Sequence, residues 1–237
     1  MTTFIPRLAH VSLPRARRAL ERVRARAAGD TSAARAVVFP LQDPDRRPAY
    51  RVPNDRVLEW GRESGGRLTA YCRLDPDDDP VAEAERCLAR GARGIKLHQR
   101  GRDWESVHPA VPAIFEVARE ADVPILLHAG RNLRSMGVLV EVALQFPEVA
   151  LVFAHAGIAD QAVLTTGLAH HPRVLYDTSC FVPYDVVELF AQVPAESIVF
   201  GSDAPYGQPW RAFPWRCGLL LTLDSAPAIA RWSRAAR

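Results

Sequence analysis

The sequence is nearly free of lysine, and it has no long apolar run near its start. Of its 30 basic residues only Lys96 is a lysine, and the formal net charge is +3. Basic and acidic residues are spread along the whole chain, with no run of like charge beyond the Arg-rich opening segment, so the charge pattern gives no sign of nucleic-acid binding. No apolar stretch near the start matches a signal peptide or a membrane span. We therefore expect a cytoplasmic protein without nucleic-acid or membrane partners.

Paired cysteine motifs and phosphate-binding loops are also missing. The four cysteines have no CxxC spacing, which argues against a zinc ribbon and against a disulfide framework. Neither GxGxxG nor GxxxxGK[ST] occurs, so the common nucleotide-binding sheets have no support. The four cysteines are Cys72, Cys87, Cys180 and Cys217.

Short β-branched runs alternate with helical patterns along the chain. With 237 residues and 48% hydrophobic content, the chain can bury one large core, and we expect a single domain over residues 1–237. The regular alternation favours a closed (β/α)₈ TIM-like barrel over an open sheet. The predicted strands are 35–40, 67–74, 92–98, 123–128, 149–155, 173–179 and 197–203, and helical patterns include 80–91, 108–122 and 135–147.

Such a barrel needs eight strands, and the sequence has no clear first strand. The run at 35–40 already follows a helical pattern at about 14–28. We expect "TTFIP" or its neighbourhood to fill part of the gap between 35–40 and 197–203. The alternative is that the gap stays open and the chain is poorly stable alone.

Four polar side chains stand at the ends of four predicted strands, namely those of His98, His128, His155 and Asp203. A barrel brings the C-terminal strand ends together around one mouth, where active sites are built. One such histidine alone is more often structural than a ligand, so the joint position of the four carries the prediction. Neutral imidazoles and a carboxylate suit Zn²⁺ or Mn²⁺.

Two cationic side chains, those of Lys96 and Arg131, are candidates for contact with the substrate. Lys96 shares a strand face with His98, whereas Ile95 and Leu97 share the opposite, helix-facing side. An amine in the lumen can have a lowered pKa, become carbamylated to bind metal, form a Schiff base or bind a carboxylate. The alternative is a packed stem with its head in solvent. Arg131, just after "HAG", is placed to pair with a substrate carboxylate, although a surface role is the commoner one.

In the order and spacing of its segments, the chain resembles the amidohydrolase-related family of metal-dependent hydrolases and decarboxylases. The resemblance covers about residues 35–207. It implies a distorted (β/α)₈ barrel in which His128 is a metal ligand, His155 is a ligand or catalytic histidine, and Asp203 is a ligand or base. The matching segments are "RAVVFP", "ND" at 54 and 55 before a helix, "RLTAYCRLDP", "RGIKLHQ", "PILLHAG", "LVFAHAG", "VLYDTS" and "IVFGSDAPYG".

One part of the family pattern is missing. The family's first strand normally carries a His-x-His pair that supplies two metal ligands, and this sequence has no such pair. We interpret His10 as structural or disordered. Either the start recorded for the chain lies downstream of that strand, or the protein works without it. Any metal would then be held by His128 and Asp203, with or without His155, and with reduced affinity.

We therefore predict a metal-dependent hydrolase that acts on a C–N or C–O bond of a small substrate, which we expect to be carboxylated. Bound Zn²⁺, or else Mn²⁺, would lower the pKa of its water to about 7. Asp203 and His155 would be catalytic, and Lys96, His98 and Arg131 would contact the substrate. The alternatives are a decarboxylase, a metal-free lactonase, and a catalytically impaired barrel that binds a ligand or a partner subunit. A homo-oligomer stays open.

Overall fold

The computed structural model of the chain describes residues 2–3, 36–41, 46–98, 107–130, 133–199, 201 and 203. Its strands are β1 (Thr2–Thr3), β2 (Ala36–Val38), β3 (Leu68–Ala70), β4 (Cys72–Arg73), β5 (Ile95–Leu97), β6 (Ile125–His128), β7 (Leu151–Ala154), β8 (Val174–Asp177) and β9 (Ile198–Val199). Its α-helices are α2 (Arg51–Glu63), α3 (Pro80–Ala89), α4 (Val111–Glu120), α5 (Leu133–Gln145), α6 (Gln161–Leu168) and α7 (Pro183–Gln192). Two 3₁₀ segments, η1 (His155–Asp160) and η2 (Ala195–Ser197), complete the described elements.

The strands follow chain order and every paired neighbour is parallel. One ladder runs β1-β2-β3 and the other runs from β4 to β9. Only Tyr71 separates β3 from β4, so these two occupy a single strand position, and the described strands fill eight positions. The Tyr71 N–H donates to the Val38 carbonyl, whereas the Cys72 N–H donates to the Gly94 carbonyl. Successive residues of this strand therefore bond to β2 along one edge and toward β5 along the other.

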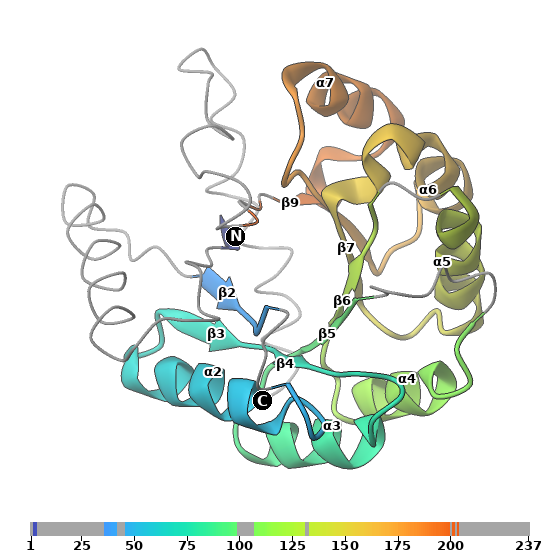
Figure 1. Cartoon of the computed structure of the whole chain (residues 1–237). Coiled ribbons are helices and arrows are strands. Elements are labelled where there is room, and N and C mark those ends of the chain that lie inside the picture. Colours follow the sequence, from blue (N-terminus) through green and yellow to red (C-terminus); the bar gives the residue numbers. More distant parts are fainter. Residues whose placement is uncertain are drawn as a thin grey trace, which may run out of the picture.

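The helices lie outside the strands, as Figure 1 shows for α2 through α7. A parallel sheet in chain order with an outer layer of helices is the arrangement of a (β/α)₈ barrel. The predicted fold class is therefore confirmed.

The N-terminal segment supplies the strand that the sequence pattern did not make clear. Thr2 and Thr3 pair in parallel with Ala36 and Val37, which confirms that this neighbourhood fills part of the gap. Within the described residues, no ladder joins β9 to β1. The rest of "TTFIP", His10 and the helical pattern at about 14–28 lie outside the described residues.

All seven predicted strands occur, and the helical patterns at 80–91, 108–122 and 135–147 correspond to α3, α4 and α5. One expectation was wrong. Asn54 and Asp55 do not precede a helix but lie inside α2. The Asn54 N–H already donates to the Tyr50 carbonyl in helical register, and Pro53 falls in the first turn, where its missing N–H leaves no helical bond unmade.

Two apolar clusters lie on the two faces of the sheet, as the alternation of side chains along each strand requires. The larger one fills the space between strands and helices and includes Ile95, Leu97 and Ile125. The smaller one lines the inner face and consists of Val37, Phe39, Leu41, Tyr71, Leu126 and Ala154. Among the described residues, no helix combines the length and the apolar character needed to cross a membrane.

Candidate active site

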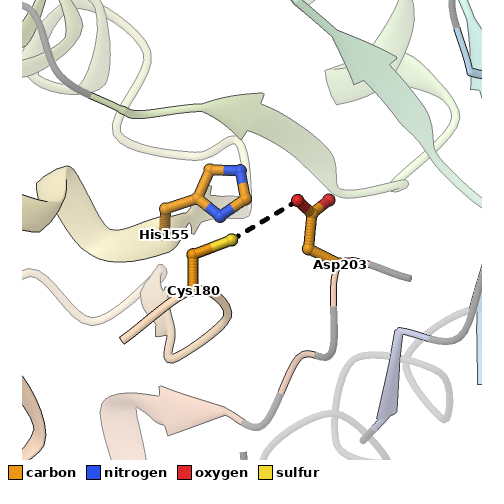
Figure 2. Close-up of side chains that lie close together, drawn as sticks. All are labelled: His155, Cys180 and Asp203. Carbon is orange, nitrogen blue, oxygen red and sulfur yellow. Dashed lines mark hydrogen bonds between the residues drawn. The ribbon is translucent and has the colours of Figure 1, made fainter. Parts of the chain in front are cut away.

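The ends of three successive strands bring together one histidine, one cysteine and one aspartate. His155 directly follows β7, Cys180 lies in the loop after β8, and Asp203 follows β9. A ring nitrogen of His155, Sγ of Cys180 and a carboxylate oxygen of Asp203 lie within 4.8 Å of one another (Figure 2). His155 is buried, Asp203 is half-buried and Cys180 is exposed, so the group opens to solvent on one side.

All three members of this group have left-handed backbone conformations. Their φ angles are 66° at His155, 64° at Cys180 and 47° at Asp203. For residues other than glycine this conformation is uncommon and costs about 1–2 kcal/mol each. Such positions concentrate at functional sites, where the surrounding structure holds them in place.

A buried chain of hydrogen bonds orients His155. The Ser179 hydroxyl donates to Oδ2 of Asp177 at 2.6 Å, and the Ser179 N–H donates to Oδ1 of the same carboxylate at 3.0 Å. Oγ of Ser179 also lies 2.8 Å from Nδ1 of His155. Because the hydroxyl proton is used toward Asp177, Oγ accepts the Nδ1–H of His155. Nε2 of His155 then carries a lone pair that can accept a proton or bind a metal ion.

Asp177 is packed too tightly to allow other arrangements. A Cβ at Gly201 would lie 1.9 Å from its Oδ1, so only glycine fits there. Burial raises the pKa of the Asp177 carboxyl, while the nearby His155 and the hydrogen bonds from Ser179 oppose that rise.

His98 and His128 extend the histidine cluster along the barrel mouth. The ring of His98 stacks on that of His128 with centroids 4.0 Å apart, and His128 meets His155 edge-on at 5.0 Å. A Cβ at Gly130 would lie 3.2 Å from Nε2 of His128, so glycine leaves room for this ring. His128 thus contacts His155 but is not a member of the three-donor group, and its part as a ligand stays a prediction.

Lys96 lies in the lumen, on the face that strand parity predicts. Its side chain is 3% exposed, and Nζ lies 5.2 Å from the centroid of Phe39, a residue of the inner cluster. Burial, helped by the charge of Arg73, lowers the Lys96 pKa to about 7, and the carboxylates of Asp203 and Asp177 act in the opposite direction. A buried amine that titrates near neutral pH is typical of functional sites.

Three residues of this region were not predicted from the sequence, and one predicted residue lies outside the part of the chain that the structure describes. Arg131 lies outside the described residues, so its substrate contact is untested. Cys180, Ser179 and Asp177 were not predicted. Asp177 could have been found, because it ends the strand in "VLYDTS" as the histidines end theirs. Cys180 could not, because its place depends on the loop after β8.

The family of the chain follows from comparison with known proteins. A family model described as amidohydrolase matches residues 4–228. The chain belongs to the amidohydrolase family. Its match is longer than the segment of about 35–207 that resembles the family in sequence, and it begins at the residue after β1. Among curated proteins, no match was found.

Solved structures share the barrel fold with this amidohydrolase. A 2,6-dihydroxybenzoate decarboxylase from Rhizobium is 17% identical, with a TM-score of 0.68 over 100% of this chain and 98% of that chain. A putative 2-pyrone-4,6-dicarboxylic acid hydrolase from Pseudomonas putida is 18% identical, with a TM-score of 0.60 over 98% of this chain and 88% of that chain. A dihydroxybenzoic acid decarboxylase from a Polaromonas species is 17% identical, with a TM-score of 0.57 over 79% of this chain and 75% of that chain. That structure contains bound manganese and the inhibitor 2-nitroresorcinol. At these identities the likeness shows the fold alone.

Proposed function

We propose that this amidohydrolase is a metal-dependent hydrolase of a small carboxylated substrate, with its active site at His155 and Asp203. The observation that carries the proposal is the meeting of these two side chains at the carboxyl ends of β7 and β9. Catalytic groups of (β/α)₈ barrels come from these strand ends. His155 and Asp203 combine a nitrogen donor and a carboxylate, the two ligand types that catalytic zinc sites use most.

The donor set fits a divalent metal ion. The bond from Nδ1 of His155 to Ser179, which is itself bonded to Asp177, is the arrangement that orients metal-binding histidines. His155 and Asp203 would hold the ion, and the ring of His128 lies beside that of His155. A bound divalent ion would supply a water molecule acidic enough to ionise near neutral pH.

The residues around this position have separate tasks. The half-buried carboxylate of Asp203 can accept a proton from the attacking water and pass it to the leaving group. His155 keeps one orientation because Ser179 holds its Nδ1. At the inner end, Lys96 and Arg73 are 3% and 5% exposed, and buried cationic side chains favour an anionic substrate group.

Decarboxylation is the second candidate. It is favoured by the likeness to the 2,6-dihydroxybenzoate decarboxylase, which spans 98% of that protein, and by the manganese-bound relative. Both this reaction and the hydrolysis named for the Pseudomonas relative use carboxylated compounds. The candidates differ in product, because decarboxylation releases CO₂, whereas hydrolysis consumes water and yields a new carboxyl group together with a hydroxyl or an amine.

An assay of the purified chain with carboxylated lactones, esters, amides and dihydroxybenzoates tests the proposal. Product analysis should show hydrolysis that is lost with a chelator and restored by Zn²⁺ or Mn²⁺. Asp203→Asn should lower kcat by about 100-fold or more, as loss of a general base does. His108→Ala is the matched control, because His108 bonds to Asp77 and neither residue belongs to the three-donor group. Chelator-resistant turnover, or Asp203→Asn with full activity, would contradict the proposal. Release of CO₂ alone would select decarboxylation.

A further inference from the structure

We propose that Cys180 binds the metal ion as a thiolate, and that this ligand makes the site selective for Zn²⁺ over Mn²⁺. The inference rests on the metal site of the proposed function and adds a ligand that the sequence pattern did not indicate. It also specifies which ion the site holds.

The geometry places the sulfur where a third ligand is needed. Sγ of Cys180 lies 3.5 Å from Oδ2 of Asp203, and both share the 4.8 Å group with His155 (Figure 2). Catalytic zinc sites use three protein ligands and leave the fourth position for water or substrate. His155, Cys180 and Asp203 together provide such a set, in a chain that has no His-x-His pair.

Cys180 differs from the other described cysteines. Cys72 and Cys87 are 1% and 0% exposed within the outer apolar cluster, so they serve as small core residues. Cys180 is exposed, and its S–H donates to the carboxylate of Asp203. An accessible sulfur beside a histidine and a carboxylate is in the setting of a metal ligand.

The loop that carries Cys180 is anchored by the residues that orient His155. The preceding residue, Ser179, is 1% exposed and bonds to Asp177 through both its N–H and its hydroxyl. It also bonds to Nδ1 of His155. One small set of bonds therefore fixes the positions of two of the three donors, and it supports the left-handed backbone of Cys180.

Metal binding would replace the hydrogen bond between the Cys180 thiol and the Asp203 carboxylate. In the structure, the Cys180 S–H donates to the Asp203 carboxylate. When Zn²⁺ binds, the S–H bond breaks, the thiolate electron pair forms the Zn–S bond, and the proton leaves to solvent. Thiolate ligands favour zinc, whereas oxygen ligands suit manganese. A thiolate in place of another oxygen or nitrogen ligand therefore shifts the preference toward zinc.

Thiol alkylation with iodoacetamide tests this directly. Cys180 should be alkylated in the metal-free protein and at least about tenfold more slowly with one equivalent of Zn²⁺, with peptide mass spectrometry separating Cys180 from Cys217. Cys72 and Cys87 should stay unlabelled in both states, because they are buried. Protection should disappear in His155→Ala and persist in His108→Ala. The cobalt-loaded protein should show a thiolate charge-transfer band that Cys180→Ser lacks, and Cys180→Ser should lose the preference for Zn²⁺ over Mn²⁺.

The outcomes separate this inference from the proposed function. If zinc binds at one per chain and Cys180 is alkylated at an unchanged rate, the thiolate ligand is wrong and the metal-dependent enzyme stands. If neither zinc nor manganese binds, both are wrong. Protection that survives in His155→Ala would show zinc held by the thiol alone, and it would overturn the shared site.

Discussion

Ser179 is a small residue on which the orientation of His155 depends. Its hydroxyl lies between the ring of His155 and the carboxylate of Asp177, and it is 1% exposed. Without the hydroxyl, Nδ1 of His155 loses its partner and the ring can turn or change tautomer. We therefore expect Ser179 to position His155 rather than to contact the substrate.

Ser179→Ala should lower metal affinity or kcat by about 10–100-fold, the usual effect of removing a group that orients a metal-binding histidine. Ser179→Thr retains a hydroxyl and is the matched control, expected to recover most of the affinity. Competition with a chromogenic chelator measures the affinity, and thermal denaturation shows whether each variant is folded. A folded Ser179→Ala protein with unchanged metal affinity and an unchanged pH profile of kcat would rule out this role.

At the scale of elements, a polar cluster joins α2 and α3 to the barrel wall. Asn54 in α2 accepts from the Arg73 N–H at 2.8 Å and donates to the Arg73 carbonyl at 3.0 Å, which ties the helix to β4. The same amide donates to Glu83 of α3 at 2.8 Å, and Glu83 pairs with Arg86 at 2.7 Å. Glu83 is 1% exposed, so its charge depends on these partners.

Glu83→Gln should lower the free energy of unfolding at pH 7 by about 2 kcal/mol, because it removes a buried charge-assisted pair. Burial alone would raise the Glu83 pKa, but hydrogen bonds from Arg86, Asn54 and Cys87 outweigh it and lower the pKa below its usual 4.5. The stabilisation is therefore present above pH 4.5 and lost as the pH falls through the lower folded-state pKa. Denaturant titrations across this range measure it, with exposed Glu85→Gln as control. A wild-type advantage that did not shrink in acid would contradict the assignment.

The elements were more predictable than the contacts between them. The apolar runs of β6 and β7 are continuous, and that of β5 is interrupted only by Lys96. Each run is followed at once by a histidine, so both the strands and the candidate mouth residues could be derived from the sequence. The break between β3 and β4 at Tyr71 leaves no such pattern, since it depends on backbone pairing with β2 and β5. The backbone has positive φ angles from His155 to Ile158, and only Gly157 in this segment is a residue type that indicates such a conformation.

The molecule as a whole concentrates its candidate chemistry on one part of the barrel. His155, Cys180 and Asp203 follow three adjacent strands of the same ladder, and Lys96 approaches from β5 in that ladder. The two-residue β1 contributes a strand position but none of the three donors. If the proposed ligands are right, this arrangement gives a chain without His-x-His three donors for one metal ion.

Metal stoichiometry tests the central claim, a divalent ion held by His155 and Asp203, most directly. Protein loaded with Zn²⁺, dialysed extensively and measured by inductively coupled plasma mass spectrometry should contain about one ion per chain. His155→Ala and Asp203→Ala should retain almost none while remaining folded by circular dichroism, and His108→Ala should match the wild type. A metal-free wild type, or equal zinc in the wild type and in both site variants, would contradict the account.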